Sequence, residues 1–178
     1  MEPGCVSSGS GPCKKAAVGS VKNVDDVPVS RLERGTFAHQ KRALGRAAGG
    51  RKIGCSHMTV PPGKAAWPLH LHAANEEALF ILQGRGRIRM GDQESEVKAG
   101  DYVALTVGTA HQLRNTSEQN LVYLAVSTME PVDLTYYPDS DKFGFFAGSA
   151  PGGSKDERWL GGFHRVQEVE YWDGEDVE

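Results

Sequence analysis

From residue 53 to residue 128 the chain is a series of short segments in which apolar and polar residues alternate. Gly86–Met90 (GRIRM) shows the pattern most clearly, and turn-forming residues such as Pro61–Gly63 and Gly91–Asp92 separate the segments. A period of two places alternate side chains on opposite faces of a strand. No long segment repeats its apolar residues with the helical period of 3.6. We therefore predict an all-β sandwich or barrel of eight strands, at residues 53–60, 67–72, 77–83, 86–90, 95–98, 101–105, 110–115 and 120–127.

The rest of the chain is expected to flank this barrel core. With 178 residues, 39% hydrophobic and 24% charged, the chain has the composition of one soluble globular domain. We predict a disordered Ser/Gly-rich lead at residues 1–20, an N-terminal arm at 21–50 and the core at 51–130. Residues 131–178 are predicted to be an irregular extension that packs on the barrel and ends in an acidic tail.

The net charge, the hydropathy and the cysteine content of the chain argue against some classes of protein and indicate its compartment. The net charge of −3 disfavours nucleic-acid binding, and no run of about 20 apolar residues could span a membrane. Cys5, Cys13 and Cys55 are an odd number without CxxC spacing, which is typical of free thiols in a reducing compartment. The first 20 residues have no apolar signal-peptide segment. These features predict a cytoplasmic protein, with an organelle transit peptide as the alternative.

A short basic patch precedes the predicted core. It comprises Lys41, Arg42, Arg46, Arg51 and Lys52. Because the patch is short and has no interleaved aromatic residues, we interpret it as a solvated face.

Four side chains in the core are candidates for metal binding. His70 and His72 are two residues apart on a predicted strand, so both imidazoles leave the same face. A short loop then brings a carboxylate to the start of the next strand, and His111 begins another. Imidazole nitrogens and a carboxylate oxygen from neighbouring strands can hold a divalent first-row metal ion.

These segments resemble the two motifs of the cupin superfamily, and the resemblance covers roughly residues 50–128. The first motif corresponds to His70, His72, Glu77 and Gly84, and the second to Gly100, Thr106, Gly108, His111 and Asn115. Thr106 replaces the usual proline, which should loosen one turn. The resemblance implies a single-domain monocupin with a double-stranded β-helix, or jelly-roll barrel. It also implies that His70, His72, Glu77 and His111 bind one divalent transition metal: Zn, Fe, Mn, Ni or Cu.

Strand parity separates neighbouring residues around this candidate site. The six-residue gap to Gly84 selects Glu77 as the ligand, so alternation turns Glu76 away. Leu79 and Ile81 share the inward parity of Glu77. A set of aromatic and aliphatic residues could line a ligand pocket or belong to the core, and these are Trp67, Leu79, Ile81 and Tyr123.

Two functions fit the sequence. The first is a metal-dependent enzyme that acts on a small polar organic molecule by oxygenation, isomerisation or decarboxylation, with unknown catalytic residues. The alternative is a non-catalytic module that binds or senses a small ligand. A phosphosugar isomerase needs a phosphate-binding cluster, and Arg114 is the only basic residue beside the motifs. The end segments carry apolar residues that need a surface, so we expect a homodimer.

Overall fold

The core contains the eight predicted strands. The structure is a computed structural model that describes residues 19–176, so most of the predicted lead lies outside it. The strands are β3 (Ile53–Val60), β4 (Leu71–His72), β5 (Glu77–Gln83), β6 (Arg85–Met90), β7 (Gln93–Lys98), β8 (Tyr102–Leu105), β9 (His111–Arg114) and β10 (Leu121–Thr128). Only β4 is much shorter than predicted. Pro68 lies in the part that is not a strand and has no N–H to donate to a neighbour.

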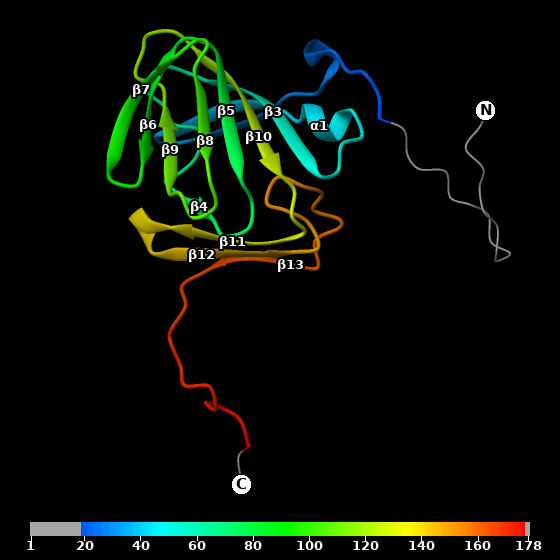
Figure 1. The fold of residues 1–178 in the computed structure, drawn as a ribbon, viewed down its shortest axis with the longest axis vertical. Helices are drawn as coiled ribbons and strands as arrows, with labels where there is room; N and C mark the ends of the chain where they lie inside the picture. Colours follow the sequence, from blue (N-terminus) through cyan, green and yellow to red (C-terminus); the bar gives the residue numbers. More distant parts are fainter. Residues whose placement is uncertain (1–18, 177–178) are drawn as a thin grey trace, which may run out of the picture.

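These strands form a jelly-roll sandwich. One sheet has the order β1-β2-β3-β10-β5-β8, and the facing sheet has the order β7-β6-β9 (Figure 1). Apolar residues from both sheets fill the space between them, among them Ile81, Ile88 and Leu121, which are at most 1% exposed. The alternation in the sequence therefore places one face of each sheet in a shared core, as predicted for an all-β fold.

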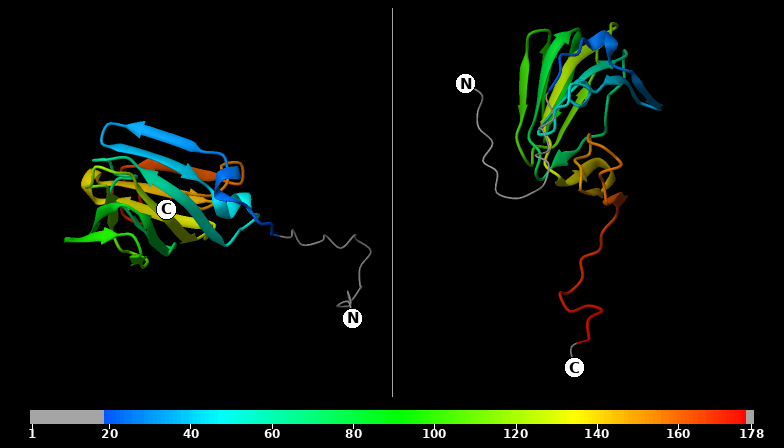
Figure 2. Two further views of the ribbon diagram at one scale, coloured as in Figure 1. Left: turned by 90° about the horizontal axis from the view of Figure 1, so that it is seen from above. Right: turned by 90° about the vertical axis from the view of Figure 1, so that its right-hand side faces the viewer.

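The end segments are more regular than the sequence suggests. β1 (Ser30–Arg34) and β2 (Phe37–Arg42) form a hairpin that extends the large sheet beyond β3 (Figure 2). β11 (Val132–Tyr137), β12 (Lys142–Ala147) and β13 (Leu160–His164) form a third sheet with β4, across one end of the barrel (Figure 1). The short helical elements are η1 (Val24–Asp26), α1 (Leu44–Ala47) and η2 (Pro138–Ser140).

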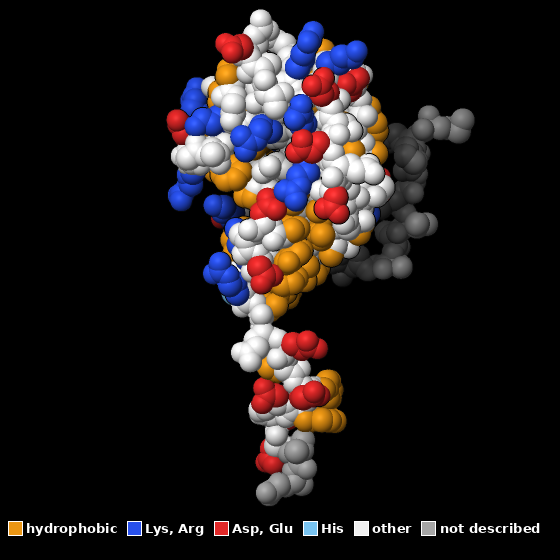
Figure 3. Space-filling view, turned by 90° about the vertical axis from the view of Figure 1, so that its left-hand side faces the viewer, with side chains coloured by type: hydrophobic (Ala, Val, Ile, Leu, Met, Phe, Trp, Pro, Cys, Tyr) orange, Lys and Arg blue, Asp and Glu red, His pale blue; other side chains and the backbone are white. Residues whose placement is uncertain are grey.

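The surface differs between the barrel and its C-terminal end. Acidic and basic side chains are interspersed over the upper part of the molecule, and hydrophobic side chains gather toward the β11–β13 sheet (Figure 3). Beyond β13 the chain extends away from the body and exposes Val166, Tyr171 and Trp172 (Figure 1). Within residues 19–176, no helix has the length and apolar character needed to cross a bilayer.

Candidate metal centre

Three histidines and one glutamate converge at the end of the barrel that the β11–β13 sheet covers. His70 and His111 pair through their backbones in an antiparallel bridge, with N–H···O distances of 3.2 and 2.8 Å. His72 ends β4 and Glu77 begins β5. Nε2 of His111 lies 3.1 Å from Glu77 Oε2, and Nε2 of His72 lies 3.7 Å from the same oxygen. Ligand atoms of His70, Glu77 and His111 all lie within 4.8 Å of one another.

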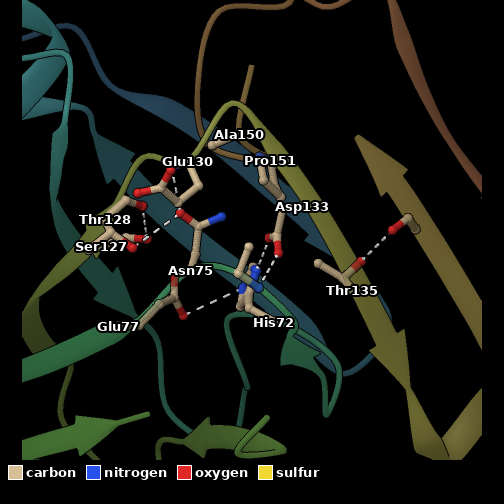
Figure 4. A network of polar contacts seen from close by, with 12 residues as sticks. His72, Asn75, Glu77, Ser127, Thr128, Glu130, Asp133, Thr135, Ala150 and Pro151 are labelled. Atoms are coloured by element: carbon tan, nitrogen blue, oxygen red, sulfur yellow. Dashed lines mark hydrogen bonds and ion pairs between the residues drawn. The ribbon is translucent and has the colours of Figure 1, made fainter. Parts of the chain in front are cut away.

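Each imidazole is oriented by an oxygen atom on its Nδ1 side. Nδ1 of His70 lies 2.9 Å from the Pro68 carbonyl oxygen, and Nδ1 of His111 lies 2.9 Å from that of Thr109. Nδ1 of His72 lies 2.6 Å from Oδ2 of Asp133 (Figure 4). A carbonyl oxygen can only accept a hydrogen bond, so Nδ1 of His70 and of His111 carries the proton. Oxygen partners of this kind fix the ring orientation of metal-binding histidines.

Asp133 is a site residue that the sequence did not reveal. Its side chain is fully buried; Oδ2 contacts His72, and Oδ1 accepts a hydrogen bond of 3.0 Å from the Ala74 N–H. It lies on β11, where it alternates with buried Thr135. The segment does alternate, but its apolar residues Val132 and Leu134 have the less buried parity and its polar residues the buried one. Apolar parity alone would therefore have assigned Asp133 to the solvent side.

The electrostatics of the centre keep a carboxylate beside the imidazoles. Burial raises the pKa of Glu77. The His111 hydrogen bond and the electrostatic interactions with His72, His111 and His70 together outweigh burial, so the pKa of Glu77 lies below its ordinary value. Burial and repulsion by His111 and His72 lower the pKa of His70 to about 4. Burial also lowers the pKa of His72, but the Asp133 hydrogen bond and nearby carboxylate charges raise it overall. The centre therefore combines an ionised carboxylate with a neutral His70.

A cavity of about 1100 Å³ opens on these four side chains. Of the residues expected to line a pocket, Trp67, Leu79 and Tyr123 do so. Ile81 does not; it is completely buried in the barrel core, so inward parity places it between the sheets rather than at the cavity. Glu76 is exposed, as predicted from the spacing to Gly84. Tyr137, on β11, stacks on His70 with ring centroids 5.7 Å apart and is a further wall residue.

Part of the basic patch also lines this cavity. Lys41, Arg46 and Arg51 are among its wall residues. Arg46 and Arg51 are exposed at the edge of the cavity, as the interpretation of a solvated face predicts, whereas Lys41 on β2 is half-buried. Arg114, the basic residue considered for phosphate binding, is not among the cavity-lining residues in the described part of the chain, and it contacts the Gly63 carbonyl oxygen instead.

The fold and the site together indicate the class of the protein. It is a small jelly-roll barrel in which three imidazoles and a carboxylate face one another at one end and form a candidate metal centre. Residues 56–127, which contain both sequence motifs, match the family model described as Cupin domain. These residues form a cupin domain.

Three known proteins show how far the similarity extends. Auxin-binding protein 1 of Arabidopsis thaliana is 24% identical over 137 residues, which are 72% of this chain and 68% of that protein. The Oxalate-binding protein of Thermotoga maritima is 34% identical over 71 residues, 40% of this chain and 58% of that protein. The crystal structure of a sugar phosphate isomerase from a cupin superfamily, of Silicibacter pomeroyi, has a TM-score of 0.67 at 21% identity. The structural match covers 88% of this chain and 95% of the isomerase chain, and at this identity the likeness concerns the fold alone.

Proposed function

We propose that this cupin binds one divalent transition metal ion through His70, His72, Glu77 and His111 and acts on a small polar organic molecule in the adjoining cavity. The observation that carries the proposal is the orientation of the three imidazoles. Each turns Nδ1 to an oxygen atom, which leaves Nε2 as the ligand atom. Nε2 of His72 and of His111 faces the Glu77 carboxylate.

All four side chains suit a transition metal in their chemistry, and the ligand atoms of His70, Glu77 and His111 lie within 4.8 Å of one another. Imidazole suits Zn, Cu, Fe and Ni, and a carboxylate extends the set to Mn. Three imidazoles and an ionised carboxylate are also costly to bury without a partner. When bound, such an ion supplies Lewis-acid chemistry to oxygen atoms of a substrate. The protein itself fixes His72 through Asp133 and walls the site with Trp67 and Tyr137.

Oxygenation, isomerisation and decarboxylation are the candidate reactions. A non-catalytic ligand-binding role is the second candidate function. The two curated relatives described above favour it, because both are named as binding proteins, for auxin and for oxalate. The two functions differ in turnover, since an enzyme converts its ligand and a binding module releases it unchanged.

Elemental analysis of the native protein followed by a turnover screen tests both proposals. The apo-protein is loaded separately with zinc and with ferrous iron and is then offered diols, keto acids and phenols, with and without oxygen. Product from the iron form under oxygen supports oxygenation, and product from the zinc form supports isomerisation or hydrolysis. Tight binding without product in either form leaves the binding role. A native protein without metal, which also fails to bind either ion, contradicts the metal centre.

We also propose that the chain forms a homodimer. The support is the set of exposed apolar side chains from the residue before β13 to the tail beyond it: Trp159, Leu160, Phe163, Val166, Val169, Tyr171 and Trp172. Exposed apolar surface of this kind usually meets a partner. Light scattering at micromolar concentration should give twice the chain mass of 19.2 kDa. A particle of the single-chain mass contradicts the dimer.

A further inference from the structure

Basic side chains predominate among the charged residues that line the cavity beside the candidate metal centre. Six basic side chains line it: Arg34, Lys41, Arg46, Arg51, Lys142 and Arg158. The carboxylates among its lining residues are Glu77, a proposed metal ligand, and Glu157. A cavity that carries one sign of charge attracts ligands of the opposite sign.

Several of these cations already have partners. Arg158 donates to the carbonyl oxygens of Ala150 and Pro151 and lies over the Phe146 ring, so it holds the loop at residues 148–154 in place. Lys142 lies over the Tyr137 ring, with its Nζ 4.8 Å from the ring centroid. These two side chains support the cavity wall.

Lys41 differs from them because its ammonium group has no such partner. Lys41 is half-buried on β2, and its side chain makes no hydrogen bond or ion pair with the residues that the structure describes. Its Nζ lies beside the 148–154 loop, 3.9 Å from where a Cβ on Gly152 would be. Arg46 contacts the same loop, with a hydrogen bond of 3.4 Å to the Ser154 hydroxyl. The two cations therefore face one loop at the same cavity.

Lys41 also shares an electrostatic environment with the metal centre. Burial lowers the pKa of Lys41, and the Glu77 carboxylate opposes this shift. A cation that is partly removed from water and makes no ion pair is unfavourable, and an anionic ligand relieves that cost. Because Lys41 and Glu77 both line the cavity, one ligand can contact both regions.

Asn75 is a buried amide at the cavity that belongs to the surroundings of Asp133. Its Oδ1 accepts from the Glu130 N–H at 2.9 Å and from the Thr128 hydroxyl at 3.3 Å, which fixes the orientation of the amide. Figure 4 shows its Nδ2 turned away from Thr128. The Asn75 side chain lowers the pKa of the Asp133 carboxyl group, so the amide helps to keep Asp133 ionised beside His72.

We infer that the cavity takes a small organic anion, whose carboxylate or phosphate group binds Lys41 and Arg46 and whose other oxygen atoms face the His–Glu centre. The second half of this inference rests on the proposed function, and the first half does not. The unpartnered ammonium group of Lys41 supplies the charge. Charge-assisted hydrogen bonds of this type are among the stronger ones in proteins.

The test compares three probes that share a three-carbon backbone and differ in charge: glycerol 3-phosphate, glycerate and glycerol. Binding to the native protein is measured by NMR titration, and metal content is measured on the same samples. The Lys41→Met variant keeps the length of the side chain and removes its charge. We expect it to bind both charged probes about tenfold more weakly or worse, with unchanged glycerol binding and metal content. Lys98→Met is the matched control, because Lys98 is exposed on β7 and does not line the cavity.

The outcomes separate this inference from the metal proposal. If no metal is found but Lys41→Met still weakens the charged probes, the metal proposal fails and the anion end stands. If metal is present and Lys41→Met binds all three probes as the native protein does, the inference is overturned. An equal loss in Lys98→Met, or no preference of the native protein for the charged probes, also overturns it. Should Lys41→Met fail to fold, Arg46→Gln takes its place with the same expected direction, and an unchanged affinity there overturns the inference.

Discussion

The barrel core and the end segments contribute to the centre in different ways. The core supplies all four proposed ligands from β4, β5, β9 and the residue before β4. The end segments supply no ligand but provide the residue that orients one, Asp133, and the cation without a partner, Lys41. The ligands lie in motifs with fixed spacing, whereas Asp133 is 61 residues from His72 along the chain. Under the proposed function, the core sets which metal ion can bind. The end segments set the affinity for that ion and the choice of organic ligand.

The strongest test of this division removes a ligand that the core supplies. The His111→Ala variant should lower metal affinity by more than about 100-fold, because loss of an orienting partner alone costs 10–100-fold. Competition with a chelator of known affinity measures it. Glu76→Gln is the matched control, since Glu76 is exposed beside Glu77, and it should keep the native metal content. Retention of metal by His111→Ala would show that the core does not set the ligand sphere.

The pH dependence of the metal-free protein should differ between two histidines that sit side by side. The pKa of His70 falls from 6.5 in the unfolded chain to about 4. The unfolded state therefore binds the extra proton first, and the stability from neutral His70 is lost as pH falls from about 6.5 to about 4, by at most roughly 3 kcal/mol. His72, which Asp133 contacts, has a raised pKa, so its contribution is present below pH 6.5 and is lost as pH rises.

Urea unfolding at several pH values between 4 and 7 measures this contrast. His70→Asn should flatten the loss of stability at low pH, and His72→Asn should steepen it. The same change of slope in both variants would contradict the opposite roles of the two imidazoles.

The contribution of the C-terminal extension to the centre is tested by Asp133→Asn. An amide lacks the negative charge that the Asp133 carboxylate places beside His72 Nδ1. We therefore expect metal affinity to fall by about 10–100-fold while the fold is kept. The ¹⁵N shifts of His72 should report a changed tautomer or orientation. Asp139→Asn removes an exposed carboxylate from the same extension and should leave metal affinity unchanged. Native affinity in Asp133→Asn would mean that the extension only covers the site.

The smallest expected effect concerns a surface contact between the two regions. Arg89 on β6 lies 3.2 Å from Asp139 in η2, and both side chains are at least 36% exposed. An exposed ion pair of this kind contributes about 0–1 kcal/mol, so Arg89→Ala should lower the free energy of unfolding by less than about 1 kcal/mol. Denaturant unfolding in low and high salt measures it. A larger loss would show that charge, rather than strand pairing, joins the extension to the barrel.

The sequence predicted the core well because its signals are local. Alternation over a few residues located β3 and β5 to β10 within a few positions, and the spacing to Gly84 placed Glu77 inward and Glu76 outward. Parity cannot distinguish a core position from a cavity position, which is why Ile81 was assigned to the pocket. Whether an inward residue lies in the core or at the cavity depends on how much of the strand the facing sheet covers.

Residues far from the motifs could not be assigned before the fold was known. The sequence by itself determined an all-β fold, because alternation is a local signal, and its resemblance to the cupin motifs implied the jelly-roll barrel and four metal-ligand candidates. Only the tertiary structure decided that Asp133 contacts His72 and that Lys41 faces the cavity instead of solvent. Both depend on where the added strands β2 and β11 pack. Strand pairing between distant segments is set by the whole sheet, and no short stretch of sequence records it.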